Sequence, residues 1–201
     1  MHTATAAADL PYTEFPGCAR FYALLDAAVA LGTPEAVTDA LRQALITLIH
    51  DPSIRLPDAV RQPVAGHYAR RELYRSPRYG YSVVAMTWGP GQSTPLHDHD
   101  GRWCVEGVWE GELEVSRYEL IDSDGERARF YLAETLRAAP GSAGSLIPPH
   151  EYHILRNPHD DAVAVSVHVY QAPLMQCARF HHDQDDWYVR EQSCLMTDTI
   201  D

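Results

Sequence analysis

The sequence predicts a mainly β protein, an antiparallel barrel or double-sheet sandwich with an N-terminal helical cap. Apolar residues in the first third recur at helical spacing, whereas short β-rich runs broken by turn residues begin at about residue 67. Several short strands at regular spacing, with no helical pattern between them, are typical of barrels and sandwiches. We expect one domain over residues 1–201, made of a cap over about 14–60, a barrel over about 65–172 and a C-terminal extension over 173–201.

Two helices are expected in the cap. The first has an apolar face formed by Phe21, Leu24, Leu25, Ala28 and Leu31. Gly32 follows as its C-terminal stop. The segment Thr33-Pro34-Glu35 then offers an N-cap, a proline at the first helical position and an acid in the first turn. The apolar face of the second helix is formed by Val37, Leu41, Leu45, Leu48 and Ile49.

The strands of the barrel are expected where β-branched and aromatic residues lie between turn residues. They are Tyr81–Trp88, Trp103–Trp109, Leu113–Leu120, Ala128–Leu132, Ser145–Ile147, His153–Arg156 and Ala162–Tyr170. The turns between them include Gly89-Pro90-Gly91, Asp122–Gly125, Pro140-Gly141 and Asn157-Pro158.

Composition excludes several classes of partner. Twenty-eight acids against sixteen bases give a formal charge of −12, which would repel a phosphate backbone, so no nucleic acid is expected. No apolar run approaches the roughly 20 residues of a membrane span, and the N-terminus lacks the pattern of a secretory signal. The four cysteines are far apart, without a C-x-x-C pair. We expect a reduced, cytoplasmic protein with no membrane partner.

Two histidines one residue apart, His97 and His99, are the first candidates for a functional site. On a strand they project from the same face, because side chains alternate with period 2. Neutral imidazoles paired in this way can close on one metal ion, and such sites suit iron, copper, nickel or zinc. The pair alone is weak evidence, since solvated and core histidines are common, so its surroundings decide.

The surroundings resemble the two motifs of the cupins. Gly91, His97-x-His99 and Gly111 have the spacing of the first motif, with Cys104 in the slot that usually holds Glu. His153 and Asn157 match the end of the second motif, with Pro148 upstream. His150 stands where that motif prefers Gly and is the fallback ligand if the second motif is misaligned. The resemblance implies a cupin fold, an antiparallel β-barrel or jelly roll.

Within the cupins, the chain resembles the thiol dioxygenases, and cysteine dioxygenase of the bacterial type in particular. The resemblance covers roughly residues 65 to 172. It rests on Cys104 in the ligand slot, on the strand Ser166-Val-His168-Val-Tyr170, on Tyr68-x-Arg70 upstream and on Trp88-Gly-x-Gly91 before the histidine pair.

The resemblance implies an iron(II) site held by His97, His99 and His153. With the carboxylate exchanged for a third imidazole, this is a variant of the non-haem iron oxygenase layout. A ligand set without a carboxylate keeps the site's charge at +2, which favours an anionic thiolate. The implied reaction adds both atoms of O2 to the sulfur of a small thiol carboxylate, with conversion of L-cysteine to cysteine sulfinate expected first and a role in cysteine catabolism.

Four further residues are expected to take part in catalysis. Ser166, His168 and Tyr170 share one strand face and form a hydroxyl–imidazole–phenol relay that positions the Tyr170 hydroxyl over the metal. The resemblance further implies a thioether crosslink between Cys104 and Tyr170. An ordinary polar barrel interior and a free buried thiol are the plain alternatives.

For substrate binding, Arg70 is the expected clamp of the carboxylate, because a guanidinium fork binds it bidentately. Arg71 lies on the opposite strand face and is the rival, while Tyr68 shares the face of Arg70. Glu106 falls two positions beyond the ligand slot and is a candidate for a supporting or substrate-selecting role. Arg102, beside the histidine pair, is a further candidate to meet an anionic substrate.

Three alternatives remain open. The first is the same reaction on another mercapto-acid, 3-mercaptopropionate or mercaptosuccinate. The second is a metal-dependent cupin isomerase or a dioxygenase of other substrates, which more often keeps the missing carboxylate ligand. The third is a non-catalytic small-molecule-binding cupin, for which loss of the metal or of Tyr170 would leave function intact.

Overall fold

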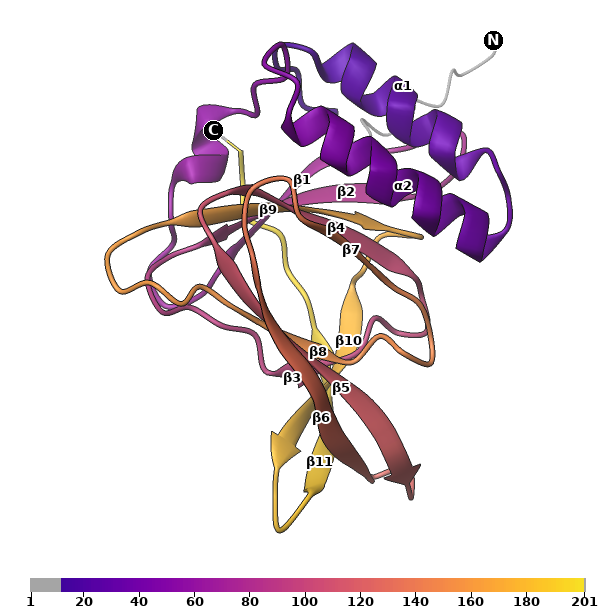
Figure 1. Ribbon diagram of the computed structural model, residues 1–201, viewed down its shortest axis with the longest axis vertical. Helices are drawn as coiled ribbons and strands as arrows, with labels where there is room; N and C mark the ends of the chain where they lie inside the picture. The colour runs from indigo at the N-terminus through magenta and orange to yellow at the C-terminus, as the bar shows by residue number, and fades with distance from the viewer. Residues whose placement is uncertain (1–11, 201) are drawn as a thin grey trace, which may run out of the picture.

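The computed structural model describes residues 12–200. Figure 1 shows a helical layer lying over one sheet, with the strands of a second sheet on the far side of it. The helical layer consists of α1 (Cys18–Val29) and α2 (Pro34–Ile49), followed by the short 3-10 helix η1 (Asp58–Arg61). This is the predicted mainly β fold with a helical cap.

The sheet beneath the helices has five antiparallel strands in the order β1-β2-β9-β4-β7. They are β1 (Ala69–Arg75), β2 (Ser82–Trp88), β9 (Ala164–Tyr170), β4 (Cys104–Glu110) and β7 (Ala143–Leu146). The second sheet closes on itself in the order β10-β11-β6-β5-β8-β3. It comprises β10 (Gln176–His182), β11 (Trp187–Cys194), β6 (Arg127–Ala138), β5 (Leu113–Ser123), β8 (His153–Arg156) and β3 (Leu96–His97).

The helices form where the sequence pattern places them. Thr33 caps α2, its hydroxyl accepting a hydrogen bond from the backbone N–H of Ala36 at 3.4 Å. The predicted apolar face of α2 is buried, with Val37, Leu41, Leu45 and Leu48 at most 3% exposed. Leu31 differs from the expectation, because α1 ends at Val29 and leaves this side chain 58% exposed.

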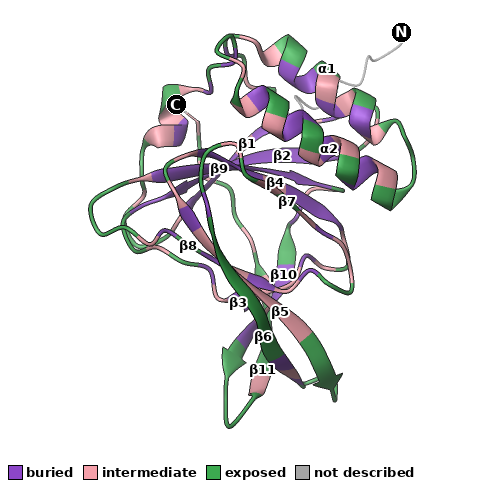
Figure 2. Ribbon diagram, in the orientation of Figure 1, coloured by how far each residue is buried: buried purple, intermediate pink, exposed green. Residues whose placement is uncertain are grey.

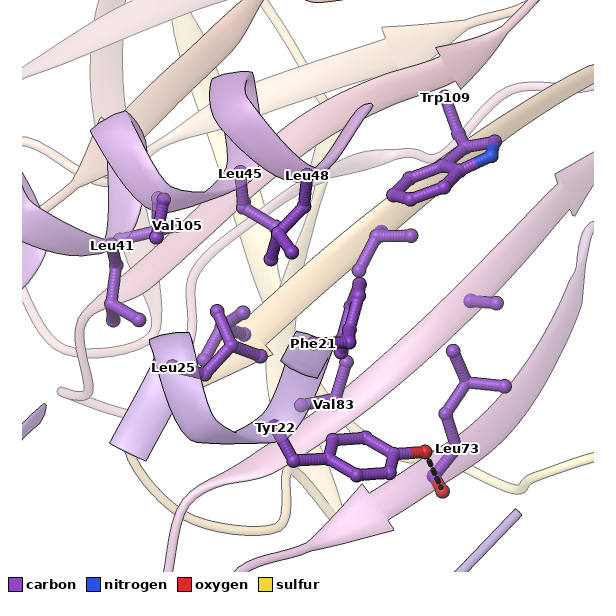
Figure 3. Close-up of a cluster of buried hydrophobic side chains, with 14 of the residues drawn as sticks. Phe21, Tyr22, Leu25, Leu41, Leu45, Leu48, Leu73, Val83, Val105 and Trp109 are labelled. Carbon is purple, nitrogen blue, oxygen red and sulfur yellow. Dashed lines mark hydrogen bonds between the residues drawn. The ribbon is translucent and has the colours of Figure 1, made fainter. Parts of the chain in front are cut away.

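The main core lies between the helices and the five-stranded sheet. Figure 3 shows Phe21, Leu25 and Leu45 packed toward Val83 and Val105 of the sheet. The hydroxyl of Tyr22 donates a hydrogen bond to the carbonyl of Leu73 at 3.1 Å. The apolar contacts on the helix side of the five-stranded sheet hold it in place. Its other face, toward the second sheet, can therefore carry polar side chains of a site.

Four strands of the structure, β1, β3, β10 and β11, are not among the strands expected from the sequence. The residues expected as a C-terminal extension form β10 and β11, which pair with β3 and β6 and complete the closed sheet. Polar residues dominate these two strands, so their sequence lacks the apolar alternation of a strand, and pairing with neighbours decides their structure. Figure 2 shows exposed residues along much of β6 and at the hairpin ends of this sheet.

Within residues 12–200, no helix combines the length and the apolar character needed to cross a membrane.

Candidate active site

The three predicted metal ligands lie together between the two sheets. His97 on β3 and His153 on β8 are direct partners in the antiparallel register. His99 follows two residues after His97, and one nitrogen of each ring lies within 4.8 Å of one nitrogen of the other two. His99 and His153 are 1% exposed, whereas His97 is partly buried and is the most solvent-exposed of the three.

Backbone carbonyls set the ring orientation of two of these histidines. Nδ1 of His97 lies 3.1 Å from the carbonyl oxygen of Pro95, and Nδ1 of His153 lies 2.9 Å from that of Glu151. A carbonyl only accepts, so in each neutral ring Nδ1 carries the hydrogen and Nε2 keeps its lone pair. Nε2 of His153 and Nδ1 of His99 are buried, and neither has a hydrogen-bond partner among residues 12–200. Three imidazoles with free nitrogens fit a transition metal such as iron.

Burial keeps these rings neutral. It lowers the pKa of His97 to about 3, with the neighbouring His153 ring adding to the effect. Burial also lowers the pKa of His99 far below its usual value, and that of His153 to a lesser extent because Glu106 opposes it. Neutral imidazole is the form that binds a metal, so the cluster is ready to bind one at neutral pH.

The relay on β9 differs from the predicted one. Nε1 of Trp88 donates to the hydroxyl of Ser166 at 2.9 Å, and that hydroxyl lies 2.8 Å from Nε2 of His168. The Ser166 hydroxyl keeps its own hydrogen and one lone pair for Nε2 of His168, so the direction of this hydrogen bond follows the tautomer of the ring. Nδ1 of His168 then lies 3.2 Å from Oε2 of Glu106, where a relay to Tyr170 was expected.

Glu106 places a carboxylate beside the three histidines. Its Oε2 is buried and lies 3.8 Å from Nε2 of His153. Burial alone would raise the pKa of Glu106, but the His153 and His168 rings outweigh burial and hold it below its usual value. The three histidines are neutral, as expected from the sequence. The neighbouring Glu106 adds a negative charge, which the cysteine at position 104 did not indicate.

Cys104 and Tyr170 lie on neighbouring strands in direct register. Both are buried in one cluster with Val84 and Met86, and burial raises the pKa of the Cys104 thiol and of the Tyr170 hydroxyl. The Tyr170 ring lies beside those of His99 and His168, with ring centroids 6.0 Å apart in each pair. The thioether between Cys104 and Tyr170 stays a prediction.

The two adjacent arginines are separated by the sheet. Arg70 lines the pocket that holds the three histidines and Tyr170. Its guanidinium donates to the carbonyls of Met196 at 3.3 Å and Leu174 at 3.4 Å, and its backbone N–H donates to Asp198 at 2.8 Å. Arg71 points the other way and donates to Thr87, Gln62 and Thr199.

Two other predicted candidates lie away from this pocket. Arg102 pairs with Asp100 at 2.9 Å, and His150 is exposed beside Glu119 at 2.8 Å. Neither lines the pocket, so Arg102 is not placed to meet a substrate there and the fallback ligand is not needed. Tyr68 does line it, with its ring stacked on Trp88 at 4.8 Å between centroids.

Sequence reasoning missed Arg179, a second arginine in the pocket. It lies on β10 directly opposite His97, so both side chains project from the same face. Cys177, two residues earlier, lines the pocket as well. The period-2 spacing of Cys177 and Arg179 would place both side chains on one face of a strand. It could not be used, because residues 173–201 were expected to form an extension and not a strand.

The motif residues that bind no ligand hold the site together. The side-chain amide of Asn157 is buried and donates to the carbonyls of Trp88 at 3.0 Å, Gly89 at 3.1 Å and Ala162 at 2.7 Å. Gly111 has a φ of +74°, and a Cβ there would lie 2.8 Å from the carbonyl oxygen of Val163. The motif spacing thus reflects turns that only these residues can make.

Comparison with known proteins agrees with this site. A family model described as cysteine dioxygenase type I matches residues 67–183. Cysteine dioxygenase type 1 of Rattus norvegicus is 23% identical over 120 residues, covering 56% of this chain and 59% of the rat protein. The protein of the same name from Danio rerio is 24% identical over 113 residues, covering 51% and 53%. The chain thus spans less than two thirds of the length of these curated relatives.

Among solved structures, an RmlC-like cupin protein from Desulfovibrio desulfuricans has a TM-score of 0.40 and 21% identity, covering 61% of this chain and 99% of that one. The family model covers more than half of the residues and includes all three clustered histidines. The chain therefore belongs to the cysteine dioxygenase type I family, with a cupin fold.

Proposed function

We propose that the chain is an iron(II)-dependent thiol dioxygenase of the bacterial cysteine dioxygenase type, which converts a small thiol carboxylate to its sulfinate. L-cysteine is the first substrate to test. The observation that carries the proposal is the pocket between the sheets, where three neutral histidines with free nitrogens lie with Arg70 and Tyr170. The reaction is R–SH + O2 → R–SO2H, in which sulfur loses four electrons and O2 gains them, so no further reductant is needed.

Each residue has a stated part in this proposal. His97, His99 and His153 hold the iron, which when bound supplies open coordination positions for a thiolate and O2. Arg70 binds the substrate carboxylate, since its two hydrogen bonds to backbone carbonyls leave other N–H groups free. Tyr68, stacked on Trp88, forms the pocket wall beside Arg70.

The polar face of β9 positions the Tyr170 hydroxyl over the substrate sulfur. Ser166 and Glu106 hold the two nitrogens of His168, and the His168 ring in turn packs beside Tyr170. Cys104, in register with Tyr170, limits the movement of the phenol and forms the proposed thioether with it.

Oxygen uptake by iron-loaded protein tests the proposal. We expect one O2 consumed per thiol with L-cysteine, and a product two oxygen atoms heavier. His153→Ala should abolish uptake, whereas the matched change His150→Ala, at an exposed histidine, should leave it unchanged. No uptake with cysteine, cysteamine, 3-mercaptopropionate or mercaptosuccinate would refute the proposal and favour a non-catalytic binding cupin.

A second candidate substrate is a thiol with two carboxylates, such as mercaptosuccinate. Arg70 and Arg179 both line the pocket. Two guanidinium groups suit two carboxylates. Arg179→Gln should then raise KM for mercaptosuccinate more than for 3-mercaptopropionate, while Arg102→Gln, outside the pocket, should change neither. Equal effects on both substrates would exclude the dicarboxylate preference.

We further propose a single cupin domain over residues 1–201, acting in the cytoplasm in cysteine catabolism. All four cysteines are free, which is the state expected in a reducing compartment.

A further inference from the structure

A second cavity, of about 180 Å³, lies between the two sheets beside the histidine pocket. It is bounded by β4, β7 and β9 on one side and by β5, β6 and β8 on the other. Most of the residues around it are apolar, and those at its inner end are deeply buried, with Leu113 at 1%, Leu155 at 2% and Leu146 at 4% exposed. None of the roles proposed for the histidine pocket uses this space.

The cavity opens to solvent where β6 and β7 border it. Leu136 of β6 is 39% exposed, and Ser142 and Gly144 are exposed as well, although all three line the cavity. Gly144 is the direct cross-strand partner of Glu106, whose side chain lines the cavity, so a side chain at position 144 would project into the same space. A Cβ built on Gly144 would have no atom within 4 Å, so the width of the opening depends on the missing side chain.

The inner end of the cavity reaches the histidine cluster. Leu155 and His168 line both the cavity and the histidine pocket, so the two spaces share a wall. Leu155 follows His153 by two residues on β8 and projects from the same face of that strand. The ring of His168 has a polar neighbour at each nitrogen, Ser166 at 2.8 Å and Glu106 at 3.2 Å, whereas the Leu155 side chain is held by packing alone. A change of rotamer at Leu155 would therefore open the wall without breaking a hydrogen bond.

The two spaces suit different reactants. Arg70 and Arg179 line the histidine pocket, and guanidinium groups attract the carboxylate of a thiol substrate. A thiol carboxylate bound there would close that side of the cluster, so O2 would need another approach. O2 is uncharged and apolar, so it enters an apolar space at little cost, whereas a charged substrate would lose its hydration there.

We propose that the second cavity is the entry path and binding site of O2, with Leu155 as the gate to the histidine cluster. The inference rests on the proposed dioxygenase reaction, because that reaction consumes O2. It adds that the two substrates reach the histidines by different routes, the thiol through the pocket of Arg70 and Arg179 and O2 through the opening between β6 and β7. The cavity changes how fast O2 arrives and takes no part in the bond-forming steps.

Xenon dissolved under pressure in a solution of metal-free protein tests the binding site without turnover. Xenon is an apolar gas like O2 and binds in apolar cavities of about 150 Å³. Backbone chemical-shift mapping should place the largest shifts at residues 113–115 and 143–146. Gly144→Phe fills the cavity from β7 and should remove these shifts, whereas Gly144→Ala, the control at the same position, should keep them. Leu136→Trp narrows the cavity from β6, should give the same result as Gly144→Phe, and replaces it if that variant does not fold.

Steady-state kinetics of iron-loaded protein at varied O2 concentration test the entry path. Gly144→Phe should lower kcat/KM for O2 about tenfold and leave kcat/KM for the thiol, measured at saturating O2, unchanged. Gly144→Ala should change neither constant. Xenon shifts centred outside the second cavity, or an unchanged kcat/KM for O2 in Gly144→Phe, would overturn the proposal.

The two proposals fail in different ways. No oxygen uptake by the unaltered protein with any thiol would end both of them. Normal uptake by the unaltered protein, together with an unchanged kcat/KM for O2 in Gly144→Phe, would end this inference alone and leave the proposed dioxygenase reaction standing.

Discussion

The two faces of the five-stranded sheet are equally buried and chemically opposite. Along β9, Val165, Val167 and Val169 are at most 1% exposed and pack in the core beneath the helices. Ser166, His168 and Tyr170 alternate with them and are at most 2% exposed, yet they face the second sheet. Burial is therefore not what distinguishes the faces. One face gains stability from apolar contact, whereas the other holds polar groups whose partners are other polar groups or ligands.

The difference teaches where to expect stability and where to expect chemistry. Among the described residues, His99 and His153 each keep a buried ring nitrogen without a hydrogen bond, and both lie on the inner side. The helix side instead satisfies its few hydroxyls, as Tyr22 and Tyr81 do with Leu73 and Asp26. Substitutions on the helix side should lower the free energy of unfolding and leave activity unchanged. Substitutions on the inner side should mainly lower activity.

The largest expected effect is on the helix side. Phe21→Ala should lower the free energy of unfolding by about 3–5 kcal/mol, because the ring is fully buried among Phe15, Tyr22 and Trp109 and its loss leaves a cavity. Urea unfolding followed by circular dichroism measures it. Leu31→Ala, at an exposed leucine beyond α1, is the control and should change stability by less than about 0.5 kcal/mol. Equal losses in the two variants would contradict this account.

A matched pair of hydroxyl deletions compares the faces directly. Tyr170→Phe should lower kcat for the proposed reaction by about 10²–10⁴-fold, the usual contribution of a positioned proton donor. Tyr81→Phe removes a hydroxyl that donates to Asp26 at 2.7 Å, so it should cost about 1 kcal/mol of stability and leave kcat unchanged. An oxygen electrode and urea unfolding supply both readouts. A lower kcat in Tyr81→Phe would break the separation of the faces.

The pH dependence of stability should separate the faces in metal-free protein. Burial lowers the pKa of His97, His99 and His153, so only the unfolded chain takes up these protons below about pH 6.5. Stability should therefore fall as pH drops from about 6.5 toward 3, by up to about 1.4 kcal/mol per pH unit for each ring.

On the helix side the sign is reversed. Burial raises the pKa of Tyr22 and Tyr81, so above about pH 10 only the unfolded chain loses these protons and stability falls as pH rises. Chemical unfolding at a series of pH values measures the fall of stability at acid pH (the acid limb) and the fall at alkaline pH (the alkaline limb). His97→Gln should flatten the acid limb alone, and Tyr22→Phe the alkaline limb alone. A variant that flattens both would show that the faces are coupled.

The smallest expected effect is at the cap of α2. Thr33→Ala removes a long hydrogen bond of 3.4 Å and should cost about 0.5–1 kcal/mol, with no change in kcat. Thr33→Ser keeps the hydroxyl and should restore most of the loss. Thermal unfolding at one protein concentration resolves a change of this size, and a full loss in Thr33→Ser would show that the methyl group and not the cap was responsible.

The sequence was informative where local spacing reflects local geometry. The Thr33 cap and the alternation of faces along β9 occur as predicted. His97 and His99 do lie together, but β3 ends at His97, so His99 reaches the cluster from the segment after the strand and not through the expected period 2. The separation of Arg70 from Arg71 follows from the same rule, because neighbours on a strand face opposite ways.

What the sequence could not provide was the pairing of distant segments. Arg179 enters the pocket because β10 pairs with β3, and Glu106 meets His168 because β4 pairs with β9. The relay therefore ends on a carboxylate, where residue order within one strand had indicated a phenol. Register between strands depends on packing across the whole sheet, and one strand's sequence carries little of that information.

The stretch behind β11 has a practical consequence for how this protein is handled. Leu195 lines the histidine pocket, the Met196 carbonyl accepts from the Arg70 guanidinium, and Asp198 accepts from its backbone N–H. A purification tag fused after this segment would directly follow the residues that hold this arginine. Michaelis constants of C-terminally tagged protein would then report the tag as well as the enzyme, so kinetic work calls for an N-terminal tag or for its removal.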